Sequence, residues 1–279
     1  MISLPVFGLI LFAAALHASW NAFLKGSSDT LLSTTLVMGG AALIAVVALP
    51  FLPAPAPASW PWLAVSAAMQ VVYLVLLVRI YHTVDMSLAY PLMRGSAPLT
   101  VALISTLWLG EVLPGIGWIG IATICIGILA MAMGARGALS LSGLAMTLVN
   151  AAIIAAYTLI DGVGARASGT PAAYTLWLSL LTGIAMAVWA IPARGGALVS
   201  YARRNWHVGL IGGLGTIVSY TIALWAMTMA PIAMVAALRE TSILFATAIS
   251  AFILRERVGP ARITAAAIIA GGTMLLRLA

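Results

Sequence analysis

The sequence predicts an all-α membrane protein with ten transmembrane helices, and three observations lead to this fold class. Of its 279 residues, 63% are hydrophobic and only 7% are charged, whereas a soluble domain has about 25% charged residues. Its mean hydropathy is +1.15. Apolar runs of about 20 residues, the length that crosses a bilayer, recur along the whole chain. Because so few charges cannot cover a water-facing surface, we expect no soluble domain.

The predicted spans follow one another with short connections. The first has no basic segment ahead of it and is long, so we expect it to be retained rather than cleaved as a signal peptide. A proline-rich stretch, LPFLPAPAPASWP, separates the second span from the third, because proline cannot continue a helix. The longest connection is expected at 193–205. The ten predicted spans are 3–23, 31–51, 60–80, 86–109, 115–134, 140–162, 171–192, 206–229, 231–254 and 260–278.

An internal repeat relates the two halves of the chain. At a constant offset of 145 positions, Arg94 aligns with Arg239 (239 − 94 = 145) and Glu111 aligns with Glu256 (256 − 111 = 145). Charged residues are so scarce in this chain that two such matches in one register are informative. The sequence therefore contains two related units of five helices each.

The repeat divides the chain into 1–136 and 137–279. Five is odd, so the halves are expected to enter the membrane from opposite sides, as in the inverted repeats of many secondary transporters. Basic residues favour the cytoplasmic ends of spans, and this predicts that both termini lie outside. The expected cytoplasmic ends carry nine basic residues: Lys25, Arg79, Arg136, Arg194, Arg203, Arg204, Arg255, Arg257 and Arg262. The other ends carry two: Arg166 and Arg277.

Four stretches resemble one known family. They are LHASWNAFLKGSSD, YHTVDMSLAYPLMRGSAPL, LWLGEVLPGIGWIGIATICIGIL and LRERVGPARITAAAIIAGGTMLL. In this order, and with the duplication, they resemble the EamA family of the drug/metabolite transporter superfamily over essentially the whole chain. The aromatic amino-acid exporters are the most similar subgroup.

The resemblance implies a ten-helix secondary transporter with a cavity between the halves, which exports amino acids or other small metabolites. Two features depart from the family pattern. Members of the family usually have cytoplasmic termini, whereas the distribution of basic residues here predicts external ones. The small multidrug-resistance branch has a membrane-embedded acid on its first helix, and the first span here has none.

Three charged residues lie deep within predicted spans: Arg94, Arg239 and Glu240. Intramembrane charges are rare and usually functional. Pro91 and Pro98 flank Arg94 and leave backbone carbonyls unbonded, so we expect a kink there. The repeat places the two arginines on opposite sides of the midplane, about 10 Å apart along the membrane normal. We expect Glu240 to pair across to the fourth helix. The alternative is that this pair only locks two helices together.

Polar and aromatic side chains form shared faces on three other helices. His17 and Asn21 are four residues apart on the first span, as are Tyr157 and Asp161 on the sixth, and this spacing places each pair on one helix face. Tyr73 on the third span shares a face with Gln70, and Tyr220 lies within the eighth. We expect these residues to line the substrate cavity. The alternative is hydrogen bonding between packed helices, which is favoured for Gln70. Asp161 could also lie half in water at a helix end.

Other features suggest no chemistry beyond binding. Glu111 and Glu256 end the fourth and ninth spans and are interpreted as interface anchors, with a gating role as the alternative. Gly209 and Gly213 form a GxxxG pattern, which allows close helix approach and is weak evidence for dimerisation. No catalytic motif, metal-binding cluster or nucleotide-binding loop is present, so we expect neither an enzyme nor a cofactor or metal. Cys125 is the only cysteine, and we expect it to be buried.

Charge favours one function over its rival. The three deep residues carry a net charge of +1, which favours a substrate with a carboxylate or similar anionic group. We therefore expect a secondary exporter of amino-acid-like metabolites in a bacterial-type inner membrane, monomeric or weakly dimeric and without nucleic acid. Protons and the substrate gradient are the two candidates for its driving force. The rival is a multidrug exporter of lipophilic cations driven by proton antiport. It requires an unpaired acid, a role that Glu240 could fill.

Overall fold

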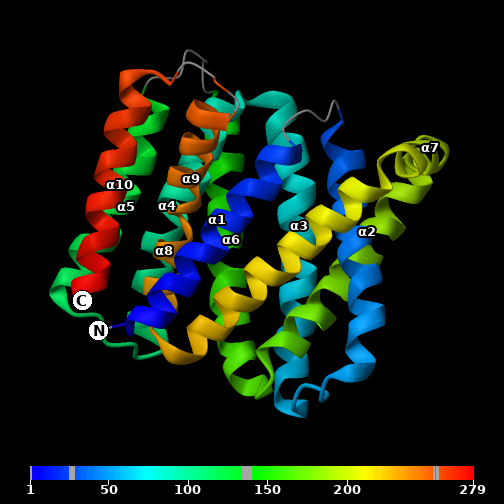
Figure 1. Cartoon of the computed structure of the whole chain (residues 1–279), viewed down its shortest axis with the longest axis horizontal. Coiled ribbons are helices and arrows are strands. Elements are labelled where there is room, and N and C mark those ends of the chain that lie inside the picture. The colour runs from blue at the N-terminus through cyan, green and yellow to red at the C-terminus, as the bar shows by residue number, and fades with distance from the viewer. Residues whose placement is uncertain (1, 25–28, 134–139, 254, 256–257) are drawn as a thin grey trace.

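The protein is an all-helical bundle (Figure 1) in a computed structural model that describes residues 2–24, 29–133, 140–253, 255 and 258–279. Both termini lie at the same end of the bundle, where Arg277 Nη1 donates to the carbonyl of Ile2 at 3.1 Å. The α-helices are α1 Leu4–Leu24, α2 Thr30–Ala48, α3 Trp60–Thr83, α4 Met86–Trp108, α5 Gly115–Ala132, α6 Leu141–Ser168, α7 Pro171–Met229, α8 Ile232–Arg239, α9 Ser242–Ala248 and α10 Pro260–Leu278. Short helices η1 Leu49–Phe51 and η2 Pro57–Ser59 connect α2 to α3, and the π-helix η3 Ile249–Ile253 extends α9.

Nine segments of the described chain are long and apolar enough to cross a membrane. The helix missing from this set is α4, which contains Arg94 and two prolines. With 23 residues and a rise of 1.5 Å per residue, α4 is about 35 Å long, which is enough to cross the hydrocarbon core. The described residues therefore form nine or ten helices that are long enough to cross a membrane, as expected for a membrane transporter.

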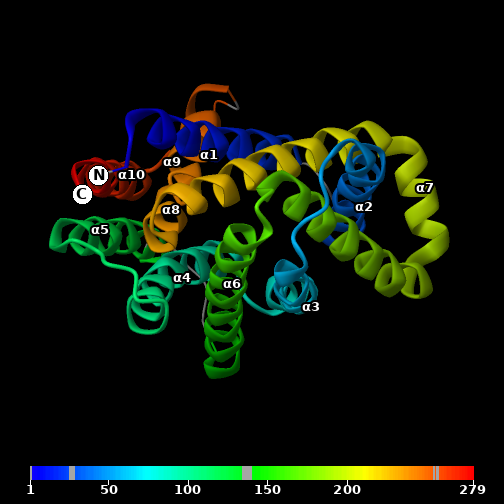
Figure 2. The same ribbon diagram turned by 90° about the horizontal axis from the view of Figure 1, so that it is seen from below.

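Helix α7 differs from the prediction. We expected a loop at 193–205 between two spans, but the chain stays helical there and departs from helical dihedral angles only at Arg194 and Asn205. These two breaks let the 59-residue helix fold back on itself, and Figure 2 shows α2 enclosed by its two arms. Two bends are enough to reverse the chain here, so the connection between the arms does not need to be irregular.

The GxxxG residues of α7 are used within the chain. Gly209 lies against Leu36, and a Cβ built on it would approach the Leu36 carbonyl oxygen to 2.9 Å. Gly213 lies equally close to the backbone of Gly40 and Ala41 on α2. Small residues allow helices to pack this closely in membranes. Because α2 covers this face, the pattern does not indicate a dimer interface.

The predicted ninth span is interrupted, whereas α4 is not. Helix α8 ends at Arg239 and α9 begins at Ser242. At the break, Glu240 and Thr241 donate their backbone N–H groups to carbonyls three residues earlier, at 3.0 and 3.1 Å. The Thr241 hydroxyl also donates to the Leu238 carbonyl at 2.7 Å. Local bonding by a threonine side chain competes with the regular helix, so the break falls at the charged residues of α8.

Helix α4 runs unbroken from Met86 to Trp108, and the kink expected near Arg94 stays a prediction. Two hydroxyls bond to backbone carbonyls within this stretch: Ser96 Oγ donates to the Leu92 carbonyl, and Thr100 Oγ1 donates to the Ser96 carbonyl at 3.1 Å. Prolines are tolerated in membrane helices where such groups and neighbouring helices satisfy the freed backbone. Helix α4 therefore stays continuous despite Pro91 and Pro98.

Candidate substrate site

An ion pair joins α4 to the break between α8 and α9. Arg94 Nε lies 2.8 Å from Glu240 Oε2, and the two side chains are 16% and 7% exposed. Neither atom has a hydrogen bond of good geometry, so the contact is an ion pair without a linear N–H···O bond. The pairing of Glu240 with α4 was predicted from the sequence and is confirmed. The break at Glu240 places its carboxylate where it meets a helix from the other half of the chain.

Arg239 is held differently. Its guanidinium carbon lies 4.8 Å from the centre of the Tyr220 ring, a cation–π contact that is stronger where water is excluded. Ion pairs between described residues are Arg94–Glu240, Arg166–Glu111 and Arg194–Asp29, and Arg239 belongs to none of them. Arg239 is therefore a half-buried cation that is held by an aromatic face and not by a described carboxylate.

The two repeat-related arginines line the same small cavity. This cavity has a volume of about 10 Å³ and lies between α1, α4, α7 and α8, where His17, Ser219, Ala13 and Ala14 complete its wall. A volume of this size is close to that of a single water molecule. We expected the two arginines to lie too far apart to share one ligand, but the structure brings their side chains to one cavity. In this state the cavity is too small for an amino acid.

The two predicted site residues of α1 have different surroundings. His17 borders the cavity and packs edge-on against Trp20, with ring centres 5.3 Å apart. Asn21 is exposed and donates its side-chain N–H to the carbonyl of His17 at 2.7 Å. The predicted shared face of α1 therefore brings His17 to the charged site, but not Asn21.

Asp161 is the most enclosed acid of the described chain. It is 0% exposed and lies seven residues before the end of α6 at Ser168 (168 − 161 = 7), so the idea that it sits half in water is wrong. Its carboxylate accepts hydrogen bonds from the hydroxyls of Tyr174, at 3.1 Å, and Tyr220, and from Gln70 Nε2 at 3.2 Å. Tyr220 thus contacts Asp161 with its hydroxyl and Arg239 with its ring face.

Tyr73 and Tyr157 form a second aromatic contact, between α3 and α6. Their ring centres are 5.7 Å apart and the rings are tilted by 59°. Both side chains are half-buried, and neither belongs to the wall of the small cavity. The predicted cavity-lining residues therefore separate into a charged group around Arg239 and this tyrosine pair beside it.

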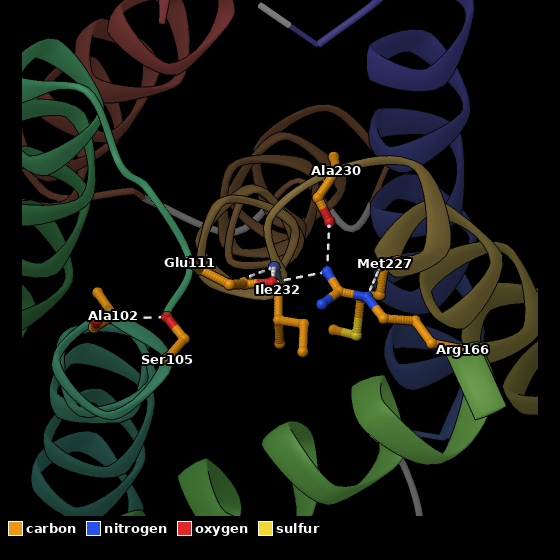
Figure 3. Close-up of polar contacts among 7 residues, drawn as sticks. All are labelled: Ala102, Ser105, Glu111, Arg166, Met227, Ala230 and Ile232. Atoms are coloured by element: carbon orange, nitrogen blue, oxygen red, sulfur yellow. Dashed lines mark hydrogen bonds and ion pairs between the residues drawn. The ribbon is translucent and has the colours of Figure 1, made fainter. Parts of the chain in front are cut away.

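A second ion pair closes the end of the bundle that carries the termini (Figure 3). Arg166 Nη2 lies 2.6 Å from Glu111 Oε1. The same guanidinium donates to the carbonyls of Met227, at 2.8 Å, and Ala230, at 3.1 Å, at the end of α7. Glu111 also accepts the backbone N–H of Ile232, at 2.9 and 3.1 Å, at the start of α8. We call these five residues the latch.

The latch satisfies two helix termini at once. A carboxylate at a helix N-terminus and a cation at a C-terminus both interact favourably with the helix dipole. Glu111 comes from the connection after α4, and Arg166, α7 and α8 all belong to the second half of the chain. The latch therefore fastens the two halves to each other at this end of the bundle.

A larger cavity, of about 380 Å³, lies away from the charged site. It is lined by uncharged residues of α1, of α7, of the connection before α3 and of the connection after α6. They include Leu9, Pro53, Pro171, Ile222 and Trp225. It is almost wholly apolar and contains none of the predicted site residues. Its nearest link to the site along the chain is Thr221, the residue directly after Tyr220 on α7.

Sequence reasoning missed part of the site. Tyr174 was not considered, although it bonds to Asp161. The interhelical hydrogen bond favoured for Gln70 is confirmed, because its side chain on α3 donates to Asp161 on α6. A signal for Tyr174 existed in Gly164, because a Cβ built on that glycine would lie 2.7 Å from two ring carbons of Tyr174. A tyrosine can reach Asp161 only if α6 carries no side chain at this position. Arg166 was counted only as a basic residue at a helix end, and its role in the latch depends on tertiary contacts.

Comparisons with known proteins find one family match and similar solved folds. Residues 141–278 match the model of the EamA-like transporter family. No curated protein matches the chain. Among solved structures, 29 chains match. One of these, described only as "Crystal structure of protein", has a TM-score of 0.79 and 18% identity over 100% of this chain and 99% of its own. At this identity, the likeness shows the fold alone.

Proposed function

We propose, from the EamA-like transporter family domain at residues 141–278, that this chain is a secondary transporter for small amino-acid-like metabolites. EamA-like proteins are membrane transporters of the drug/metabolite type, not a family of enzymes. The two five-helix halves would move relative to each other in alternating access. The resemblance to amino-acid exporters favours export across a bacterial-type inner membrane, by a monomer or weak dimer with external termini.

Arg239 is the single observation that carries the choice of substrate. It is the cation of the charged site that no described carboxylate neutralises, and Tyr220 holds it at the wall of a cavity. A guanidinium binds planar carboxylates through two parallel hydrogen bonds. The substrate's anionic group would replace the cation–π contact of Arg239, and Arg94 would stay paired with Glu240. His17 and the tyrosines would border the remainder of the substrate.

A specific observation also supports the rival function, export of lipophilic cations. That function requires an acid without a cation partner. Glu240 does not meet this requirement in the structure, because it pairs with Arg94. Asp161 does meet it, because its hydrogen-bond partners are neutral side chains: two tyrosines, a glutamine and a serine, Ser66. The two functions differ in which residue binds substrate, Arg239 for an anionic group and Asp161 for a cation.

Reconstitution tests these two functions against each other. Liposomes containing the purified protein would be loaded with an unlabelled amino acid, and the same amino acid in labelled form would be added outside. Each member of a panel of amino acids would be tested in turn. Labelled tetraphenylphosphonium would be tested in the same way. We expect counterflow of at least one carboxylate-bearing amino acid and none of tetraphenylphosphonium. Counterflow of tetraphenylphosphonium alone would favour the rival, and no counterflow above protein-free liposomes would contradict transport altogether.

The latch indicates which state of the transport cycle the structure represents. Alternating access requires one face of the site to be closed while the other opens. Here the latch fastens the two halves at one end of the bundle, with the Glu111 side chain 8% exposed. We therefore interpret the structure as closed on the latch face. If the termini lie outside, the latch is the outer gate, and a periplasmic reporter fused to the C-terminus would be active.

Weakening the latch should open this face. The Glu111→Gln variant loses the charge that binds Arg166 and caps α8. We expect this to destabilise the closed state by about 1–2 kcal/mol, which corresponds to roughly a 5- to 30-fold rise in the population of the open state. The readout is the rate at which an impermeant maleimide labels a cysteine placed at position 219 (Ser219→Cys) in a protein that also carries Cys125→Ser. Position 219 is chosen because Ser219 lines the small cavity. We expect labelling to be faster by that factor.

The more exposed ion pair between Arg194 and Asp29 provides the control for the latch experiment. Arg194 pairs with Asp29 at 2.9 Å, near the bend of α7 at the opposite end of the bundle (Figure 1). The Asp29→Asn variant breaks this pair and should leave the labelling rate of Ser219→Cys unchanged. If Glu111→Gln labels no faster than Asp29→Asn, the latch does not control access to the site.

A further inference from the structure

One acid of the charged region has only neutral partners. Glu240 faces Arg94, and Glu111 faces Arg166. Asp161 is as enclosed as these two, but it accepts its hydrogen bonds from Tyr174, Tyr220 and Gln70. Its side chain is therefore a carboxylate in the membrane interior that hydrogen bonds stabilise and that no ion pair neutralises.

Such a group can lose its charge in a way that a paired acid cannot. Burial disfavours the ionised form of a carboxyl group, and an adjacent cation or donated hydrogen bonds favour it. Asp161 has the hydrogen bonds without the cation. Protonation would remove the buried charge, and the Tyr174 hydroxyl could then turn to accept the new O–H. The surroundings of Asp161 thus suit both protonation states.

The elements packed against α6 present few other charges to Asp161. From α3 comes Gln70, and from α7 come Tyr174 and Tyr220. The cations on neighbouring helices are Arg94 of α4, which is paired with Glu240, and Arg239 of α8, which lies behind the Tyr220 ring. On α6 itself, Tyr157 packs against Tyr73, and Arg166 is bound to Glu111.

Tyr220 joins Asp161 to Arg239, the arginine proposed to bind the substrate. Its hydroxyl donates to the Asp161 carboxylate, and its ring face supports Arg239 at 4.8 Å. Arg166 of the latch is five residues beyond Asp161 on the same helix, about 7.5 Å along its axis. A proton could therefore reach Asp161 from the latch face once the latch opens, whereas the Tyr220 ring separates the carboxylate from the small cavity.

We propose that Asp161 is the proton-binding site of this transporter and that Tyr220 couples it to Arg239. This inference rests on the proposed function of Arg239. A proton from water on the latch face converts the Asp161 carboxylate to a neutral carboxylic acid, and its release to water reverses the step. Ionised Asp161 holds Tyr220, and Tyr220 holds Arg239. Protonated Asp161 releases Tyr220, so Arg239 is free to bind an anionic group.

The sign of this coupling follows from charge. With Asp161 ionised, the two arginines and two acids of the region sum to zero, and with Asp161 protonated they sum to +1. Protonation therefore strengthens the binding of an anion, and by reciprocity the anion strengthens proton binding. The proton and the anionic substrate would cross together. An inward proton gradient would then oppose export, so export requires a substrate gradient directed outward.

Infrared difference spectra of the purified protein test the site without any substrate. A protonated carboxyl group has a C=O stretching band that an ionised one lacks. As the pH is lowered, we expect a band in the wild type that is absent from Asp161→Asn. The matched control is Asp85→Asn. Asp85 is exposed, and the hydrogen bonds from Ser87 keep the pKa of its carboxyl below the usual range. This control should keep the Asp161 band. If Asp161→Asn and wild type give the same spectra, Asp161 binds no proton.

A second variant keeps the test decisive if Asp161→Asn does not fold. Tyr220→Phe removes one donor to the ionised carboxylate and retains the ring under Arg239. Because a lost donor disfavours the ionised form, the Asp161 band should appear at higher pH than in the wild type. An unchanged titration in Tyr220→Phe would overturn the coupling through Tyr220.

Transport assays separate the failure of this proposal from the failure of the proposed function. In liposomes, an imposed pH gradient should change the net uptake of the labelled amino acid by the wild type relative to its counterflow, and this ratio should not respond to the pH gradient in Asp161→Asn. If the wild type moves no amino acid, the proposed function fails, and the infrared result still decides whether Asp161 binds a proton. If the wild type moves the amino acid and the variant still responds to the pH gradient, the proton site is wrong.

Discussion

Replacing Arg239 by alanine is expected to cause the largest loss of transport of any single substitution in this chain. A hydrogen bond to a charged group contributes about 1.5–3 kcal/mol, and each 1.4 kcal/mol is a factor of ten in affinity. Arg239→Ala should therefore lower amino-acid counterflow by roughly 10- to 100-fold. Because Arg239 makes no described ion pair, the variant leaves no buried carboxylate without a partner and should fold normally.

Two further variants define the role of Arg239. Arg239→Lys keeps the charge but loses the planar fork that binds a carboxylate and stacks on Tyr220, so we expect poor rescue. Arg204→Ala removes an exposed arginine near the bend of α7 and should transport like the wild type. Near wild-type counterflow by a well-folded Arg239→Ala protein would show that this arginine has no role in binding.

The Arg94–Glu240 pair is expected to have the largest effect on stability. Breaking a buried ion pair by removing one partner typically costs about 3–5 kcal/mol, whereas replacing both partners by apolar residues is often neutral. We expect Arg94→Leu and Glu240→Leu each to lower the thermal midpoint of unfolding in detergent. The double variant Arg94→Leu/Glu240→Leu should recover most of the loss.

The same variants distinguish a structural pair from a functional one. If the pair only locks α4 to α8 and α9, the stable double variant should transport normally. If the pair takes part in the cycle, the double variant should be stable but inactive, and Glu240→Gln should lower turnover more than it weakens binding. We expect the second outcome, because Arg94 and Arg239 border the same cavity.

The sequence predicted the helical bundle because membrane helices leave a strong trace in hydropathy. It also identified the residues of the charged site, since arginine and glutamate within apolar spans stand out, and it predicted the pairing of Glu240 with α4. It could not place the helix break. Two prolines near Arg94 pointed to an irregularity in α4, but the break lies at Thr241, whose hydroxyl bonds locally to the backbone. Threonines also occur inside unbroken helices of this chain, such as Thr147 and Thr158 of α6, so residue type alone does not locate the break.

Contacts between distant segments were beyond sequence reasoning. Tyr174 reaches Asp161 through space that Gly164 leaves open, and Arg166 reaches Glu111 across 55 positions of the chain. Neither contact has a periodicity or a motif. The position of Asp161 was underestimated for a related reason, since the sequence did not show that α6 continues to Ser168. The ends of helices are the part of a membrane fold that hydropathy defines least well.

The most direct test of the central claim is a binding cycle that deletes the substrate's carboxylate and the Arg239 side chain separately. The amino acid that shows counterflow would be compared with its amide, by competition, in wild type and in Arg239→Ala. If Arg239 binds the carboxylate, the wild type should prefer the acid over the amide by roughly 10-fold or more, and Arg239→Ala should bind the two equally. If the preference for the acid is the same in both proteins, the carboxylate binds elsewhere and the account is contradicted.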